Sequence, residues 1–304
     1  MNLLSIATIK NLLTEFGTKP SKGMGQNFLI DEKTLNNIIE AAQLTEEDTV
    51  LEIGPGLGTL TKALAEKAKK VIAIEKDAVF IEILKKTLSN FMNVDIINGN
   101  ILKMNFQLSI INFQSNSNIQ LPKNYKLVAN LPYYITSPVI RKFLEMENSP
   151  TSMVFMIQKE VAQRICAKPP NMSLLAVSVQ YYAKPEIISY VSKKCFWPSP
   201  NVDSAIIKIV PRNYAEINPA KSPESDSGAS AKPPQKKDID LFFKVAKAGF
   251  SHPRKQLLNN LSVSLKMNKE KINLWLLTNN IRPSQRAETL TIENWTSLAN
   301  SFPV

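Results

Sequence analysis

TVLEIGPGLG, residues 49–58, joins a short apolar run to a glycine-rich turn. The run from Val50 to Ile53 is typical of a buried β-strand. Glycines at the turn let the backbone bend tightly and approach a bound molecule closely. The pattern from 57 to 68 then predicts a helix. The stretch therefore predicts a strand, a tight turn and a helix, the unit from which α/β nucleotide-binding domains are built.

The same alternation of strand and helix continues on both sides of this unit. A second helix is predicted over 79–88. Further apolar runs predict strands at 71–74, 94–97, 126–129, 153–157, 187–191 and 205–210. Continuous apolar strands separated by helices indicate a parallel sheet that is covered on both faces. The fold class is therefore α/β.

Composition excludes several classes of protein. The 304 residues are enough for one large domain and a small one, and 44% are hydrophobic. Two cysteines and one histidine exclude a disulfide framework, a Cys-rich zinc module and a multi-histidine metal site, so no metal is expected. No apolar run approaches the roughly 18–20 residues that span a bilayer. We expect a cytoplasmic protein with no membrane partner.

The charge is distributed unevenly along the chain. The net charge is +11, yet residues 34–150 carry 12 basic and 12 acidic side chains. Residues 151–212 carry 8 basic and 3 acidic side chains, and residues 238–304 carry 9 and 5. A neutral body with basic flanks favours a polyanionic partner, foremost nucleic acid. A basic surface that only aids solubility is the alternative.

Two polar stretches interrupt the pattern and suggest the domain organisation. Residues 107–124 are rich in Asn, Ser and Gln and predict a long surface loop. Residues 213–237 are rich in Pro, Ser and Lys, a composition that cannot bury a core, and predict a flexible linker. We therefore expect a first domain over 1–212 and a helical domain over 238–304.

The glycine-rich turn and a later carboxylate predict a cofactor site. Glu75 ends the second strand of the pattern, 21 residues after Gly54, where such domains place the carboxylate that holds ribose hydroxyls. The spacing is G-x-G-x-G and not that of dinucleotide binders, and Glu52 would repel a pyrophosphate. A cationic nucleoside without phosphate suits the site better, and S-adenosylmethionine is one. A plain strand-to-helix turn is the alternative.

Asn100 follows the third strand, at a position that commonly carries an Asp bound to the adenine amino group of the cofactor. An Asn carbonyl oxygen can accept the same hydrogen bond without charge. A simple turn formed by Gly99 and Asn100 is equally natural.

Asn130-Leu131-Pro132-Tyr133 follows the fourth strand, at the edge of the sheet where ligands bind. The chemistry fits the exocyclic amine of adenine, whose lone pair is delocalised into the ring. The Asn130 side-chain carbonyl and the Leu131 backbone carbonyl are suited to accept both amine hydrogens. Pro132 has no N–H to compete, and Tyr133 offers a flat face for the base. An ordinary loop turn is the alternative.

With these motifs the chain resembles the ribosomal RNA adenine dimethyltransferases of the type that acts on small-subunit rRNA. The resemblance runs from Gly25 almost to the C-terminus and includes residues 52–58 and 130–133. Three further blocks match the family's pattern, at 25–29, 158–164 and 196–204. The resemblance implies a Rossmann-like, class I S-adenosylmethionine-dependent methyltransferase domain followed by a small all-helical domain.

The resemblance also implies site residues and a substrate. The residues expected to contact S-adenosylmethionine are Asn27, Leu29, Gly54, Gly56, Glu75, Asn100 and Asn130. Tyr133 and Phe196 would sandwich a flipped adenine. The implied reaction adds two methyl groups to N6 of each of two adjacent adenines in the 3′-terminal hairpin loop of 16S rRNA, during small-subunit biogenesis. Relatives usually carry Asp where this chain has Asn100. We expect a monomer.

Basic residues suggest where RNA binds. Residues 251–256 are expected to open a helix in the second domain, with Arg254 and Lys255 contacting phosphate, and Lys159 and Arg164 extending a basic track. Solvated helix faces are the alternative for each of them.

Two other functions remain open at this point. One is the antibiotic-resistance relative that modifies one adenine of large-subunit rRNA. The other is an RNA-binding assembly factor without catalysis. The block at 196–204 and the Arg254-Lys255 segment favour the small-subunit type, and intact Glu75 and Asn130 to Tyr133 argue against the assembly factor.

Overall fold

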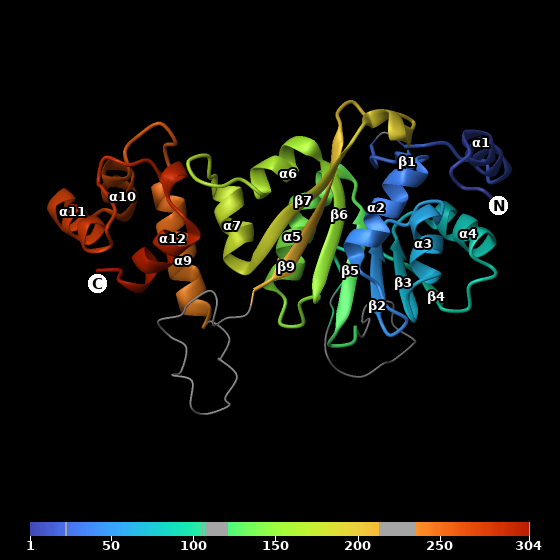
Figure 1. The fold of residues 1–304 in the computed structure, drawn as a ribbon, viewed down its shortest axis with the longest axis horizontal. Helices are drawn as coiled ribbons and strands as arrows, with labels where there is room; N and C mark the ends of the chain where they lie inside the picture. The colour runs from blue at the N-terminus through green and yellow to red at the C-terminus, as the bar shows by residue number, and fades with distance from the viewer. Residues whose placement is uncertain (22, 105, 107–120, 213–234, 304) are drawn as a thin grey trace. The chain divides into compact units, whose positions relative to one another are not determined.

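A seven-stranded sheet forms the centre of the first of two units in the computed structural model, which describes residues 1–21, 23–104, 106, 121–212 and 235–303 (Figure 1). This unit comprises Met1–Ala162 and Pro185–Pro211. In space the strands follow the order β4-β3-β2-β5-β6-β9-β7. Their bounds are β2 Thr49–Ile53, β3 Lys70–Glu75, β4 Val94–Asn98, β5 Tyr125–Asn130, β6 Ser152–Gln158, β7 Ala183–Val191 and β9 Ser204–Pro211. All seven strands predicted from the sequence are confirmed.

Strand pairing is parallel from β4 through β6, and β9 runs antiparallel to β6. The carboxyl ends of β2, β3, β4 and β5 therefore meet at one edge of the sheet. Side chains along each strand alternate between the two faces. On one face Val50, Val71 and Val128 pack in a cluster with residues of α2 and α3. The strand sequences are apolar on both faces because both faces are covered.

Helices lie on and around this sheet, and some of them begin at polar caps. Asp31 accepts a hydrogen bond from the Thr34 N–H at the start of α2, and Asp77 accepts one from the Val79 N–H at the start of α4. The helix bounds are α1 Ile6–Glu15, α2 Glu32–Ala42, α3 Thr59–Ala65, α4 Ala78–Thr87, η1 Tyr133–Ile135, α5 Thr136–Glu145, α6 Lys159–Ile165 and η2 Lys193–Cys195. The helix predicted at 57–68 is present but covers only Thr59–Ala65, and the helix predicted at 79–88 is confirmed one residue earlier, as Ala78–Thr87.

A two-stranded ribbon adds a feature that the apolar pattern did not predict. β1 (Phe28–Leu29) pairs antiparallel with β8 (Phe196–Trp197), so that Leu29 stands opposite Phe196. The Ile30 N–H also donates to the Cys195 carbonyl at 2.9 Å. Two-residue strands carry too little pattern to be recognised in a sequence. The ribbon brings together blocks 25–29 and 196–204, which are far apart in the chain.

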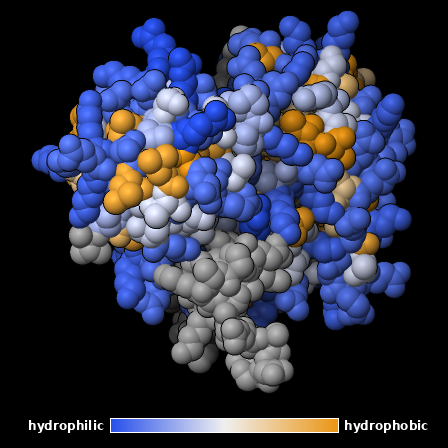
Figure 2. Space-filling model, turned by 60° about the vertical axis from the view of Figure 1, so that its left-hand side comes forward, coloured by the Kyte–Doolittle hydropathy of each residue, from blue (hydrophilic) through white to orange (hydrophobic). Residues whose placement is uncertain are grey.

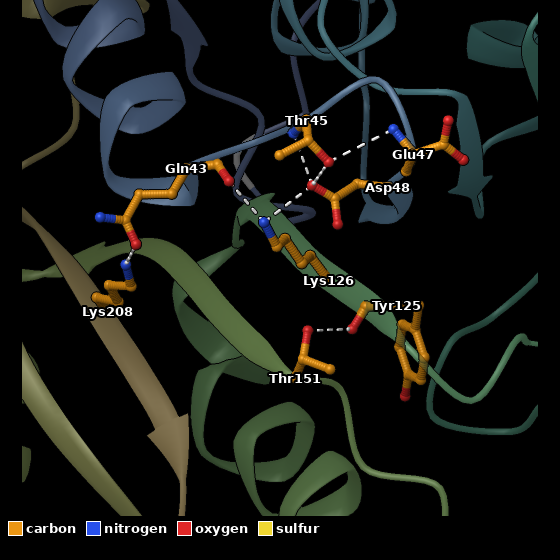
Figure 3. Close-up of polar contacts among 8 residues, drawn as sticks. All are labelled: Gln43, Thr45, Glu47, Asp48, Tyr125, Lys126, Thr151 and Lys208. Atoms are coloured by element: carbon orange, nitrogen blue, oxygen red, sulfur yellow. Dashed lines mark hydrogen bonds and ion pairs between the residues drawn. The ribbon is translucent and has the colours of Figure 1, made fainter.

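The amino ends of the strands are held by a polar network around Lys126 (Figure 3). Its Nζ donates to the Gln43 carbonyl at 2.6 Å and to Asp48 Oδ2 at 2.9 Å. Lys208 Nζ donates to Gln43 Oε1 at 2.6 Å. Burial opposes ionisation of Asp48, but hydrogen bonds from Lys126 and Thr45 outweigh it and hold the pKa of Asp48 below its ordinary value. The network joins the end of α2 to the starts of β2 and β5.

The second unit comprises Gln163–Lys184 and Arg212–Val304 and is helical where it is described. Its core includes Phe242, Trp275 and Trp295. From the first part of the unit, Tyr181 stacks on Phe242 with the ring centroids 4.0 Å apart. The helix bounds are α7 Leu174–Tyr182, α9 Lys236–Gly249, α10 Leu257–Leu265, α11 Lys269–Thr278, η4 Ala287–Thr289 and α12 Ile292–Asn300.

The unit boundaries differ from the division at residue 212. Residues 163–184, which we expected in the first domain, pack in the second unit, because Ala176, Val177 and Tyr181 of α7 are buried in its core. Of the expected linker, residues 213–234 lie outside the described residues, and Lys236 already begins α9. Residues 107–120 of the expected loop also lie outside them.

Apolar side chains gather in patches on an otherwise hydrophilic surface (Figure 2). In the second unit the exposed apolar residues include Val263 on α10 and Leu274 and Leu277 on α11.

Candidate active site

A cavity lies at the carboxyl edge of the sheet, between the strand ends and the β1–β8 ribbon. The turns that follow β2, β3, β4 and β5 all contribute to its lining. It is lined by every residue that the sequence predicts for cofactor binding and catalysis: Asn27, Leu29, Gly54, Gly56, Glu75, Asn100, Asn130, Leu131, Pro132, Tyr133 and Phe196. The topology thus brings six separate segments of the sequence to one place.

The glycine-rich turn has a backbone that other residues rarely adopt. Gly54 has φ +68° and Gly56 has φ +57°, both in the left-handed region. A Cβ at Gly56 would also lie 3.5 Å from the Phe28 ring. The turn therefore presents bare backbone to the cavity, as close contact with a ligand requires.

Glu75 ends β3 and is held by backbone donors. Its Oε1 accepts hydrogen bonds from the N–H groups of Lys76 at 2.8 Å and Asp77 at 2.9 Å. Its Oε2 accepts one from the Gly56 N–H at 3.2 Å. Burial raises the pKa of Glu75, and these hydrogen bonds act in the opposite direction. The carboxylate is thus oriented beside the glycine turn, and its Oε2, which accepts a single N–H, keeps acceptor capacity for a ribose hydroxyl.

Glu52 is a second carboxyl group of this cavity, and it is more deeply buried. The residue is 1% exposed, and its Oε2 has no hydrogen-bond partner among the described residues. Burial raises the pKa of Glu52 to about 8, and the negative charge of Glu75 acts in the same direction. Without ligand, Glu52 is therefore mostly protonated at neutral pH. The sequence identified Glu52 as a negative charge, but burial decides its protonation.

This burial predicts a pH dependence of stability. Between about pH 4.5 and pH 8 the native state keeps the Glu52 proton, while the unfolded chain loses it. The contribution of Glu52 to the free energy of unfolding is therefore fully present below the ordinary pKa of a glutamate and falls as pH rises toward 8. We expect Glu52→Gln to raise the free energy of unfolding by on the order of 2–3 kcal/mol at pH 7, and by little at pH 5. Urea unfolding of the cofactor-free protein at both pH values measures this.

The exposed Glu66, at the end of α3, provides the matched control. Glu66→Gln should leave the pH dependence of unfolding as it is in the wild type. Parallel curves for wild type and Glu52→Gln would contradict a buried, protonated Glu52.

Asn100 lies in the turn that follows β4. Its side-chain Oδ1 accepts a hydrogen bond from the Leu102 N–H at 3.1 Å. Its backbone carbonyl accepts one from the Met104 N–H, also at 3.1 Å. The oxygen proposed to bind the cofactor's adenine thus also stabilises the turn. An amide oxygen has two lone pairs, so the two roles are compatible.

The turn 130–133, called the acceptor turn after its predicted role, begins where β5 ends. Asn130 stands opposite Met156 of β6, and the Leu131 N–H donates to the Met156 carbonyl at 3.1 Å. Asn130 Nδ2 donates to the Asn27 carbonyl at 3.4 Å, which orients the side chain. No described residue donates to Asn130 Oδ1. The amide oxygen is therefore available at the cavity.

Tyr133 and Phe196 line the cavity from different elements. The Tyr133 hydroxyl shares a 2.9 Å hydrogen bond with the fully buried Ser204 Oγ, and burial raises the pKa of Tyr133. Phe196 is only 4% exposed and is fixed in the ribbon opposite Leu29. Sequence reasoning missed the role of Ser204, although it ends the block at 196–204.

The comparisons with known proteins agree with this geometry. A family model described as ribosomal RNA adenine dimethylase matches residues 17–222. A protein of Dehalococcoides mccartyi (strain BAV1) named Ribosomal RNA small subunit methyltransferase A is 42% identical, over 98% of this chain and 93% of its own length. The protein of the same name from Clostridioides difficile (strain 630) is 39% identical, over 96% of this chain and 93% of its own length. The chain belongs to the ribosomal RNA adenine dimethylase family.

Two solved structures resemble the fold. The dimethyladenosine transferase from Plasmodium falciparum has a TM-score of 0.66 and 26% identity, and covers 89% of this chain and 95% of that one. The 23S rRNA methyltransferase ErmE has a TM-score of 0.68 and 24% identity, and the match covers 90% of this chain and 99% of that one. The predicted Rossmann-like methyltransferase fold is confirmed. As a member of the family, the chain is an S-adenosylmethionine-dependent rRNA adenine dimethyltransferase.

The basic residues of this dimethyltransferase occupy different settings. Lys159 begins α6, and its Nζ lies 5.2 Å from the centre of the Tyr190 ring. Arg164 lies in the last turn of α6. Arg254 and Lys255 are exposed, but they do not open a helix as expected: α10 begins at Leu257, and residues 251–256 form the preceding loop.

The physical reason for this correction is local. Pro253 interrupts helical hydrogen bonding. In addition, Asn260 Nδ2 donates to the carbonyls of Gly249 and His252, which fixes the loop on α10.

The described residues contain no group of three or more His, Cys, Asp or Glu side chains that could hold a metal ion. No helix in the described part of the chain is long and apolar enough to cross a membrane.

Proposed function

We propose that this enzyme dimethylates N6 of two adjacent adenines in the 3′-terminal hairpin loop of 16S rRNA, within the small ribosomal subunit or its precursor. The observation that carries the proposal is the turn 130–133 at the cavity, where no residue of the described part of the chain donates to the Asn130 amide oxygen. The relatives named for the small subunit support the choice of rRNA, because they match nearly the whole chain. Action as a cytoplasmic monomer stays a prediction.

The residues of the cavity fit S-adenosylmethionine. The bare backbone of the Gly54–Gly56 turn leaves room for close approach, and Glu75 is oriented to accept from ribose hydroxyls. Asn100 is proposed to face the adenine of the cofactor, and Asn27 and Leu29 to line its other side. Bound there, S-adenosylmethionine supplies a methyl group on a sulfonium, which is already an activated leaving group.

The acceptor turn is proposed to orient the target base. Asn130 Oδ1 and the Leu131 carbonyl accept the two hydrogens of the amine, which directs its nitrogen lone pair toward the methyl group. The ring of Tyr133, held through Ser204, and the ring of Phe196 stack on the flipped adenine. Positioning is the main catalytic device, because the leaving group needs no further activation.

Arg254 and Lys255 are proposed to bind RNA phosphate, since both are exposed in the loop before α10. We expect replacement of both by Ala to weaken RNA binding and to lower the slope of log affinity against log salt by about 1–2 units. Titrations at several salt concentrations measure the slope. Affinity for S-adenosylmethionine is the internal control and should not change; an unaltered slope would mean that the two side chains only face solvent.

A direct test uses the purified enzyme with unmethylated small and large subunits and radiolabelled S-adenosylmethionine, followed by mass spectrometry of the rRNA. We expect dimethyladenosine at two adjacent positions of 16S rRNA. Methylation of one adenine in 23S rRNA would favour the large-subunit function. Binding of RNA without methyl transfer would favour an assembly factor.

A further inference from the structure

Lys142, in the last turn of α5, is bound to three backbone carbonyls of another segment. Its Nζ donates to the carbonyls of Ile101 at 2.8 Å, Leu102 at 3.4 Å and Met104 at 2.5 Å. An ammonium group has three donors, so these acceptors satisfy it completely. The sequence analysis did not single out this lysine.

The surroundings show that Lys142 is held by this turn and by no carboxylate. None of the ion pairs among the described residues includes Lys142, and burial lowers the pKa of its ammonium group. The Phe106 ring lies 5.3 Å from its Nζ, and the same ring packs 5.6 Å from Phe143 of α5. The turn after β4 is thus attached to α5 on two sides.

The attachment links two parts of the candidate active site, the turn after β4 and the acceptor turn before α5. Asn100, Ile101 and Leu102, in the bound turn, line the cavity. At its other end, α5 continues directly from the acceptor turn through η1. A single helix therefore connects the segment that carries Tyr133 with the segment that carries Asn100.

We propose that Lys142 is a positioning residue, which holds the 100–104 turn at the adenine end of the cofactor and keeps it in a fixed place relative to the acceptor turn. The proposal rests on the role proposed for Asn100 and its turn in cofactor binding. Lys142 itself is not among the residues that line the cavity. Its side chain acts through the three carbonyls, so its loss should disturb cofactor binding first.

The experiment measures the dissociation constant of S-adenosylmethionine by calorimetry on the full-length chain. We expect Lys142→Met to raise it about tenfold to a hundredfold, as loss of charge-assisted hydrogen bonds predicts. Arg141→Met is the matched control, because Arg141 lies next on α5, is exposed and pairs only with Glu145. Lys142→Gln, which keeps two donors, replaces the Met variant if the latter does not fold.

A double-mutant cycle distinguishes positioning from a general loss of stability. If Lys142 acts through the turn, adding Asn100→Ala to Lys142→Met should weaken binding less than about threefold further, although Asn100→Ala alone weakens it more. Full additivity would overturn the inference, as would a Lys142→Met affinity equal to that of wild type. An unchanged Asn100→Ala affinity would refute the role of Asn100 alone, since Lys142→Met still reports on Ile101 and Leu102.

Discussion

Asn130→Ala should reduce the rate of methyl transfer by roughly 10²–10³-fold, which corresponds to the loss of one transition-state contact of about 3–4 kcal/mol. Among the described residues none donates to Asn130 Oδ1, while Nδ2 is bound to the Asn27 carbonyl, so the oxygen is the atom proposed to accept from the target amine. The substitution leaves the basic side chains that are proposed to bind RNA unchanged. Single-turnover methylation with saturating RNA and cofactor isolates the chemical step, and RNA affinity should remain that of wild type.

Asn36, exposed on α2, supplies the matched control. Asn36→Ala should methylate at the wild-type rate. Tyr133→Phe removes the hydrogen bond to Ser204 but keeps the ring, so we expect a milder loss. If Asn130→Ala methylates at the wild-type rate, the acceptor role of Asn130 is refuted, whatever the rate of the Tyr133→Phe variant.

Glu75→Ala should weaken binding of S-adenosylmethionine by at least about 10–10²-fold, because a ribose hydrogen bond to a charged acceptor contributes about 1.5–3 kcal/mol. The structure adds a second reason. The carboxylate also accepts from the N–H groups of Gly56, Lys76 and Asp77, so its removal frees the backbone of both turns. Calorimetry with S-adenosylmethionine measures the loss directly.

Glu75→Gln separates the two contributions, since it keeps the size of the side chain and one carbonyl oxygen. We expect it to weaken binding less than Ala does. Glu82→Gln, on the exposed side of α4, is the matched control and should bind as wild type does. Equal affinity of wild type and Glu75→Ala would remove Glu75 from the cofactor site.

Several features followed from the sequence because they depend on local pattern. The seven strands of the sheet are contiguous apolar runs, and such runs are recognisable without their partners. The motifs at 52–58 and 130–133 each follow a strand that belongs to a parallel array. Because such strands end at one edge, their neighbourhood could be expected before any contact was known. The predicted residues at the ends of these strands, Gly54, Gly56, Glu75, Asn100 and Asn130 to Tyr133, line one cavity for this reason.

Other features depend on partners that are distant in the chain. The β1–β8 ribbon needs residues 28–29 to meet 196–197, and neither pair has a pattern of its own. Residues 163–184 pack in the second unit because α7 finds its apolar partners in α9, which no local signal indicates. The loop at 251–256 is held by hydrogen bonds from the Asn260 side chain of α10 to the carbonyls of Gly249 and His252, contacts that are near in sequence but that no periodic pattern marks.

The fold class, the family and the residue types of the candidate site can be read from the sequence, because strand periodicity and short motifs are properties of neighbouring residues. The state of the groups within that site depends on how the chain folds. Burial protonates Glu52, the Asn27 carbonyl orients Asn130, Ser204 holds Tyr133, and Lys142 binds the turn of Asn100. Each of these effects depends on a distance or a loss of solvent between segments far apart in the chain, and those quantities exist only once the chain is folded.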